Sequence, residues 1–297
     1  MILISPYTIT SSELTTNIPE TPPNAYNPAT TYGLGAEVSD LTNHLIYESL
    51  QAANTGNDLT DTAWWLELGA TEPWKMFDEY VGTYSSYADE IDVTIDYPEI
   101  IDSLTIQEVD ATRVQIIVTD PLEGEVYNKT YELVDYSVSD YYEYFFAPYR
   151  IVRNITVLDL PPYRDATVRV IISEPGGTVK CGNLIVGQQV DIGHTQYGPR
   201  VGMIDKSKKD IDGFGRAYLK QGNYSRRMVC DLWLYNEDFD RVFEELVKVR
   251  ATPTAFIGDA RDGGFQSLNL FGFFVDFDMT IPGPTVSVCT IEIQGFI

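Results

Sequence analysis

The chain has 297 residues, of which 44% are hydrophobic, and its formal net charge is −24. This length and composition suffice for two or three domains with hydrophobic cores, and they exclude a chain that is disordered throughout. The sequence has no run of about 18 apolar residues, and MILISPYTIT lacks the basic region and cleavage site of a signal peptide, so we expect neither membrane insertion nor secretion.

The acidic residues are concentrated in the first half of the chain. Residues 1–149 hold 26 acidic and 3 basic side chains, whereas residues 150–297 hold 18 and 17. Such a surplus repels phosphate, so we do not expect the N-terminal half to bind nucleic acid. Two interpretations of the acidic half remain open. The acids either keep a crowded assembly soluble or form a face that docks on a basic partner.

The first part of the chain divides into an arm, a compact segment and a linker. Residues 1–25 contain TSSELTTNIPETPPN, whose Thr, Ser and Pro predict an extended N-terminal arm instead of packed structure. A segment marked by aromatic residues follows at 26–69. Residues 70–84 are predicted to form a linker that leads out of this segment.

From residue 85 onward the sequence is mostly β. Runs rich in β-branched and aromatic residues alternate with Gly, Pro, Asn or Asp, and we expect a β-sandwich at 85–200 and a β-rich assembly domain at 201–297. The passage ATVRVIISEPGGTVKCGNLIVGQQVDIGHTQYG is similar to the last strands of galactose-binding-like jelly rolls, which implies a jelly-roll-like sandwich. The predicted strands are IDVTIDY, RVQIIVTD, YNKTYELVDY, NITVLDL, ATVRVIISE, GNLIVGQQVDIG, RMVCDLWLY, FQSLNLFGFFVDFDMTI and TVSVCTIEIQGF.

A tyrosine-rich stretch interrupts this β region at residues 135–150. Strand alternation cannot bury all of its aromatic side chains, so some of them must be exposed. The exposed ones form either a subunit interface or a ligand surface. The tyrosines concerned are Tyr136, Tyr141, Tyr142, Tyr144 and Tyr149.

The sequence predicts one helix, at residues 237–250. Its apolar residues have the spacing i, i+3, i+4, i+7, i+8 of an amphipathic helix that packs on a sheet. These residues are Phe239, Val242, Phe243, Leu246 and Val247. The stretch DKSKKDIDGFGR at 205–216 lacks most of a calcium-binding loop and is interpreted as a charged hairpin.

No pattern typical of an enzyme is present. The phosphate-binding, dinucleotide-binding, GxSxG and HExxH motifs are all missing from the sequence. Two histidines and the three separated cysteines, Cys181, Cys230 and Cys289, make neither a zinc site nor a disulfide framework, so we expect buried free thiols. We therefore expect no enzymatic activity, no metal site and no cofactor.

The segment YNPATTYGLGAEVSDLTNHLIYESLQAANTGNDLTDTAWWLELG at 26–69 resembles the small chitin-binding-type carbohydrate-binding modules. The resemblance implies a small three-stranded domain and a carbohydrate ligand. It departs from the family at its first position, where tyrosine replaces the more usual tryptophan. The matching positions are Tyr26, Tyr32, Gly35, Val38, Tyr47, a Trp at 64 or 65, and Leu66.

The residue types in this segment also suit a sugar, because the apolar C–H face of a pyranose stacks on an exposed aromatic ring. The alternative is structural, because so small a module needs one Trp for its core. Adjacent strand residues point to opposite faces, and we expect Trp65 to pack inward beside Val38 and Tyr47. Trp64 would then be more exposed. The candidate carbohydrate-binding residues are Tyr26, Tyr32, Tyr47, Trp64, Trp65, Asn57 and Asp61.

The part of the chain that begins HTQYGPRVGMIDKSKKD resembles tail proteins of tailed bacteriophages, in particular baseplate or tail-tip components. The resemblance implies a structural protein of the virion, made in the host cytoplasm, that forms a homo-oligomeric ring with other tail proteins as partners. Its sugar ligand would be a host-surface polysaccharide. The alternative is a free-standing carbohydrate-binding protein with no role in assembly.

Overall fold

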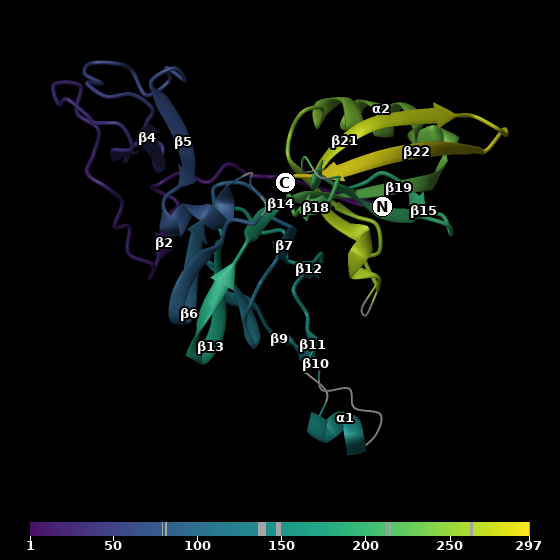
Figure 1. Cartoon of the computed structure of the whole chain (residues 1–297). Coiled ribbons are helices and arrows are strands. Elements are labelled where there is room, and N and C mark those ends of the chain that lie inside the picture. Colours follow the sequence, from purple (N-terminus) through teal and green to yellow (C-terminus); the bar gives the residue numbers. More distant parts are fainter. Residues whose placement is uncertain are drawn as a thin grey trace.

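The computed structural model is mainly β, as the sequence predicts, with 52% of residues in strands and 9% in helices. Figure 1 shows a small sheet (β3 to β5) at one end, a β-sandwich beside it, and a larger curled sheet with helix α2 on the other side. The helical segments are η1 (Glu72–Phe77), α1 (Tyr141–Phe146), η2 (Asn236–Asp238), α2 (Phe239–Lys248) and η3 (Gln266–Leu268). The structure describes residues 1–78, 80, 82–135, 141–146, 150–211, 213, 215–261 and 264–296.

The largest sheet joins the sandwich to the C-terminal part of the chain. In the described residues it has ten antiparallel strands in the order β12-β7-β14-β1-β20-β21-β22-β19-β15, with β16 also paired to β19. Its strands are β1 (Ile2–Pro6), β7 (Ser103–Gln107), β12 (Ile155–Val157), β14 (Asn183–Asp191), β15 (His194–Thr195), β16 (Arg200–Asp205), β19 (Tyr224–Tyr235), β20 (Thr254–Ile257), β21 (Asn269–Thr280) and β22 (Val286–Gly295).

Strand β1 lies in the middle of this sheet, between β14 and β20. Successive side chains of a strand point to opposite faces. Leu3 is therefore buried in the C-terminal core, whereas Ile4 is buried on the opposite face with Ile185 and Phe271. Residues 1–25 thus differ from the expected unpacked arm, because the alternating apolar start packs into the sheet although the polar stretch after it suggested an arm.

The β-sandwich forms where a second sheet packs against β7, β12 and β14. One core fills the space between the two sheets and contains, among others, Ile95 and Val170 from the second sheet and Leu104 and Val186 from the first. Strand β8 shows the alternating burial expected of a sheet with one buried face. The second sheet has the order β2 (Leu14–Thr16), β6 (Ser85–Asp96), β13 (Thr167–Cys181), β8 (Arg113–Asp120) and β9 (Gly124–Glu132).

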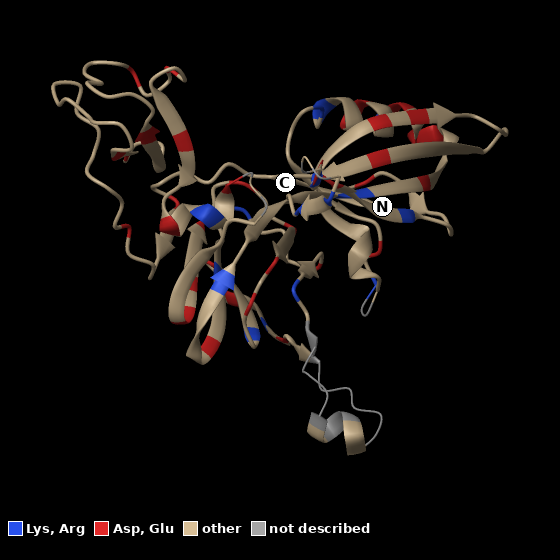
Figure 2. Ribbon diagram, in the orientation of Figure 1, with Lys and Arg blue, Asp and Glu red and all other residues tan. Residues whose placement is uncertain are grey.

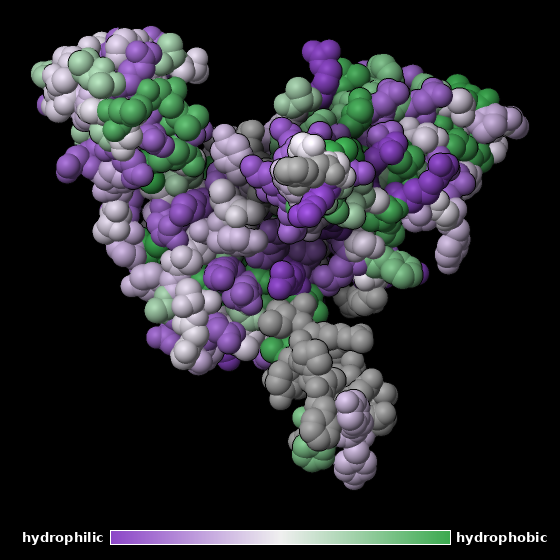
Figure 3. Space-filling view, in the orientation of Figure 1, coloured by the Kyte–Doolittle hydropathy of each residue, from purple (hydrophilic) through white to green (hydrophobic). Residues whose placement is uncertain are grey.

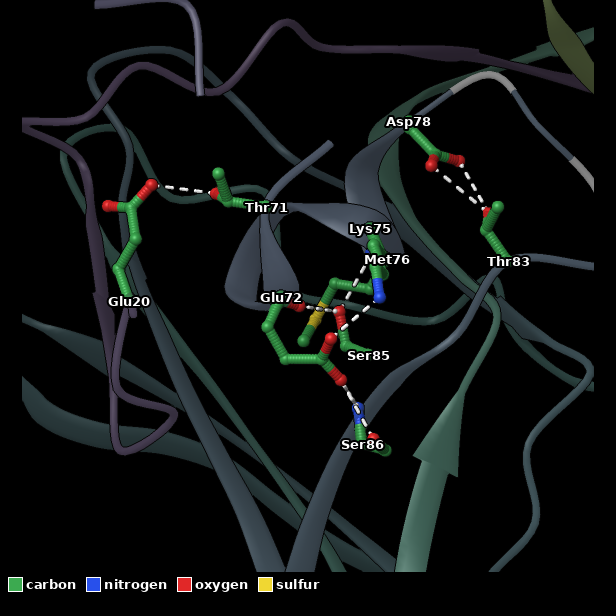
Figure 4. A network of polar contacts seen from close by, with 9 residues as sticks. All are labelled: Glu20, Thr71, Glu72, Lys75, Met76, Asp78, Thr83, Ser85 and Ser86. Atoms are coloured by element: carbon green, nitrogen blue, oxygen red, sulfur yellow. Dashed lines mark hydrogen bonds and ion pairs between the residues drawn. The ribbon is translucent and has the colours of Figure 1, made fainter. Parts of the chain in front are cut away.

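The predicted linker at 70–84 is packed against the sandwich through the 3-10 helix η1 (Figure 4). Glu72 accepts hydrogen bonds from the backbone N–H and hydroxyl of Ser86 and from Lys75 Nζ. The Ser85 hydroxyl donates to the carbonyl of Glu72 and accepts from the N–H of the buried Met76. These contacts fix how the chain passes from the small sheet into β6.

The predicted helix near the C-terminus is confirmed as η2 followed by α2. Its buried side chains, Val242 and Leu246, enter the core formed by β1, β19 and β22. Phe243 and Val247 are about half exposed, and the ring of Phe243 contacts Phe277 on β21. The apolar stripe is therefore only partly buried, because one narrow face of the helix meets the sheet.

The tyrosine-rich stretch contains helix α1, which the strand pattern did not predict. It lies beyond the two-stranded pair β10 (Val134–Asp135) and β11 (Arg150–Ile151), away from the rest of the chain (Figure 1). Tyr141 and Tyr142 are exposed, as the density of aromatic residues predicted. Tyr136, Tyr149 and the side chain of Tyr144 lie outside the described part of the chain.

Candidate functional site

The 26–69 module is built on an antiparallel sheet of β3 (Glu37–Asp40), β4 (Leu45–Ser49) and β5 (Trp65–Ala70). Val38 pairs with Tyr47, and Ser49, two residues further along β4, pairs with Trp65. Trp65, Tyr47 and Val38 therefore share one face of the sheet, as the sequence predicted. The small sheet expected from the sequence is confirmed.

Trp65 is the centre of the module core, with 2% of its surface exposed. Its ring lies edge-on to Tyr26 and Tyr32, with ring centroids 5.7 and 5.3 Å away. Its indole N–H donates to the carbonyl of Asn57 at 3.1 Å, and the hydroxyl of Tyr26 donates to the same oxygen at 2.7 Å. The three aromatic residues and this carbonyl hold the long loop before β5 against the sheet.

Two linked side-chain amides continue this polar contact into the module. The Asn57 amide donates to Asn54 Oδ1 at 2.8 Å, and the fully buried Asn54 donates to the hydroxyl of Ser49 at 3.0 Å. Ser49 in turn donates to the carbonyl of Gln51. When all buried polar groups are paired, they favour one conformation of the loop, because other conformations would leave some of these groups unpaired. Asn57 is therefore a structural residue of the loop.

Trp64 and Asp61 belong to the turn that leads into β5. The Asp61 carboxylate accepts from the N–H of Ala63, and its carbonyl accepts from the N–H groups of both Trp64 and Trp65. The Trp64 side chain is partly exposed, in contrast to buried Trp65. The structure thus confirms the predicted difference between the two indoles.

A groove of about 630 Å³ opens on the module between β3, the turn after it and the loop at 56–60. Two of the predicted residues, Tyr26 and Tyr47, line it, whereas Tyr32, Trp64 and Trp65 do not. The other polar residues along it are Ser39, Asp40, Thr42, Asn43, Asp58 and Thr60. Half-buried phenol rings beside carboxylate, amide and hydroxyl groups can both stack on a ligand and hydrogen bond to it.

The charges at the groove are all negative, and together with burial they raise the pKa of its two phenols. Burial and then the carboxylate of Asp58 raise the pKa of Tyr26, while burial and then Glu67 and Asp40 raise the pKa of Tyr47. Partial burial raises the pKa of Asp40, but the hydrogen bonds from Asn43 and Thr42 outweigh it and make the net shift downward. The groove therefore offers the Tyr47 hydroxyl as a donor beside carboxylate acceptors.

Sequence reasoning missed Asp40, Asn43 and Asp58 as groove residues. The signal for Asp40 and Asn43 was local, since Asp followed within three residues by Asn is typical of a turn closed by the Asp side chain. The position of Asp58 across the groove depends on the packing of its loop on Trp65, which no local pattern gives. The predicted carbohydrate-binding residues are therefore divided among the groove, the module core and the turn before β5.

A second feature, the ribbon, consists of β17 (Lys208–Ile211) and β18 (Ala217–Lys220), which pair with each other as an antiparallel hairpin. The predicted charged hairpin is therefore present. Every residue of both strands is exposed. Among them are Tyr218 and Leu219, and Leu219 is 80% exposed. The ribbon leaves the curled sheet between β16 and β19, and β18 is labelled near the centre of Figure 1.

The cysteines are buried free thiols, as expected. Burial raises the pKa of Cys181 and Cys289 to about 12 and that of Cys230 to about 11, so they are unreactive at neutral pH. The described residues contain no group of three or more His, Cys, Asp or Glu side chains placed to hold a metal ion. In the same part of the chain, no helix has the length and apolar character needed to cross a membrane.

Comparison of the chain with models of known protein families gives no match, and a search among curated proteins finds no significant relative.

Proposed function

We propose that the chain is a structural subunit of a bacteriophage tail, at the baseplate or tail tip. It assembles with copies of itself and with neighbouring tail proteins, and it displays the 26–69 module toward glycans of the host surface. The observation that carries the assembly role is the ribbon, whose strands are exposed along their whole length.

An isolated two-stranded ribbon is only marginally stable in water. This ribbon also exposes Ile211, Tyr218 and Leu219, which gain free energy only when another surface covers them. Its outer strand edges carry unpaired backbone groups that can add to a sheet of another protein. A neighbouring subunit is the partner that satisfies both requirements.

Charge favours a partner that resembles the first half of this chain. Lys208, Lys209 and Lys220 lie on the ribbon, whereas residues 1–149 carry 26 acidic and 3 basic side chains. In Figure 2 acidic residues, coloured red, occur along the strands of the module and the sandwich. A ribbon that docks on the acidic part of the next copy produces a head-to-tail contact, and such contacts form a ring when the rotation between successive copies closes.

The module groove supports a glycan that carries no negative charge. No lysine or arginine occurs before Lys75 in the sequence, and Asp40 and Asp58 line the groove. Anionic polysaccharides are therefore repelled. Leu66 and Leu68 on β5 are also exposed, and apolar surface covers this side of the module in Figure 3. This apolar side gives the module a second surface for contact with a neighbouring tail protein.

Two measurements on the full-length chain test the proposal. Light scattering should give the mass of a closed oligomer, and a glycan array should show binding to neutral glycans that Tyr47→Ala abolishes. Asp61→Ala is the matched control, because Asp61 lies in the turn before β5 and not in the groove. A monomer that binds glycans would instead support a free-standing carbohydrate-binding protein. A monomer without glycan binding would contradict both functions.

A further inference from the structure

A second cleft, of about 400 Å³, opens where the sandwich meets the C-terminal part of the chain. Its walls come from the end of β7, the start of β14, the segment that joins the ribbon to β19, and the start of β19 itself. The segment before β6, the start of β21, the end of β22 and Phe296 complete them. Figure 1 shows β14, β18 and the C-terminal end together near the centre of the molecule. The cleft shares no residue with the groove of the 26–69 module.

Gln107 is the residue that marks this cleft as a binding site. It is the last residue of β7, only 6% of it is exposed, and it lines the cleft. Its Nε2 amide group has no hydrogen-bond partner in the described part of the chain. A buried donor without an acceptor is unfavourable and rare in folded proteins. Nε2 is closed to solvent in this conformation, and a rotation of the side-chain amide would bring it to an acceptor atom of a ligand in the cleft.

Two charged residues of opposite sign line the cleft and are held by neighbouring groups. Glu108 accepts a hydrogen bond from the Tyr84 hydroxyl at 3.1 Å, and its own N–H donates to Asn154 Oδ1. Its backbone lies in the left-handed region, with φ of 55°, which is costly for a non-glycine residue and clusters at functional sites.

Opposite this carboxylate, Arg226 donates to the carbonyl of Ser267 at 2.9 Å. Burial lowers the pKa of Arg226, while the nearby Tyr224 and Glu108 raise it. The guanidinium is thus desolvated and close to Glu108. Among the described residues that line the cleft, one carboxylate and one guanidinium carry charges that offset each other, which disfavours phosphates, nucleotides and polyanions as ligands.

We propose that this cleft binds a neutral saccharide of one or two rings. The amide of Gln107, the carboxylate of Glu108 and the guanidinium of Arg226 supply the mixed donors and acceptors that hydroxyl groups require. Tyr224 and Phe296 supply aromatic surface for the apolar face of a pyranose. The volume lies within the range of small-molecule sites. The site is independent of the proposed tail function and of the module groove.

Saturation-transfer NMR on the full-length protein tests this proposal. The probes are glucose, galactose, mannose, N-acetylglucosamine, maltose, cellobiose and lactose. At least one of them should bind. Gln107→Leu should weaken that binding about tenfold or more without lowering Tm, because it removes an unpaired donor and keeps an apolar volume in place.

Two further variants keep the result decisive. Tyr224→Ala changes an exposed residue, so it should fold normally and also weaken binding, whereas Tyr47→Ala in the module groove should leave binding at the cleft unchanged. The proposal is overturned if none of the seven sugars binds. It is equally overturned if Gln107→Leu and Tyr224→Ala retain full affinity, or if only Tyr47→Ala abolishes it.

Discussion

Replacing Trp65 with alanine tests which of two adjacent indoles holds the 26–69 module together. The side chain is 2% exposed, contacts the rings of Tyr26 and Tyr32, and donates a hydrogen bond to Asn57. Removal of a buried Trp typically costs about 3–5 kcal/mol. A core in a unit of this size rarely supplies more than about 3–5 kcal/mol in total. Trp65→Ala should therefore unfold the module while the sandwich stays folded.

Hydrogen exchange on the full-length protein, read by mass spectrometry, measures this local unfolding. In Trp65→Ala, amides of β3 to β5 should lose protection while those of β6 and β13 keep theirs. Trp65→Phe keeps an aromatic ring and loses the hydrogen bond to Asn57, so it should cost less, about 1 kcal/mol or somewhat more. Trp64→Ala should cost about 1 kcal/mol or less. Equal, negligible effects of the two alanine variants would refute the assignment of opposite faces.

Two further predictions concern the large sheet and the loop between its strands β20 and β21. A Cβ at Gly187 would lie 2.2 Å from the carbonyl oxygen of Ser5 on β1, so Gly187→Ala should cost about 1–3 kcal/mol. Gly202→Ala, with open space around it, should change Tm little, and equal melting of the two variants would contradict the close packing of β1. The Arg261 guanidinium lowers the pKa of Asp259 well below its ordinary value through two hydrogen bonds. A carboxyl group whose pKa is lower in the folded than in the unfolded state stabilises the fold fully above its unfolded-state pKa of about 3.9. This stabilisation is lost as the pH falls below that value. The free energy of unfolding measured with urea should therefore decrease as the pH falls below about 4. It should decrease less in Asp259→Asn. Identical pH profiles of the two proteins would be inconsistent with this ion pair.

The sequence predicted the strands well because buried and exposed residues alternate along most of them, and this alternation is visible locally in the sequence. Every predicted run from IDVTIDY to TVSVCTIEIQGF overlaps a strand, and the amphipathic stretch near the C-terminus is the helix α2. The packing of β1 was missed because it depends on pairing with β14 and β20, which lie about 180 residues or more further along the chain. Helix α1 was missed because dense tyrosines suit a strand as well as a helix.

The candidate site was predictable only in part, for a related reason. Alternation along β5 was sufficient to expect that Trp65 and Trp64 differ, and the structure bears this out. The sequence did not show which residues of the module line the groove and which form its core. Tyr26 contributes to both, and Asp58 reaches the groove through a long loop. No sequence pattern indicated Gln107 as a site residue, because a single glutamine at the end of a strand matches no motif.

The mass of the full-length protein in solution, with and without a substitution on the ribbon, tests assembly most directly. Leu219→Asp places a charge on the exposed ribbon, and Ile281→Asp makes the same kind of change at an exposed position after β21, outside both the ribbon and the acidic first half. Light scattering should show a closed oligomer for the unaltered chain and for Ile281→Asp, and smaller species for Leu219→Asp. A monomer in all three samples at every concentration, or an oligomer of unchanged mass in all three, would contradict assembly through the ribbon.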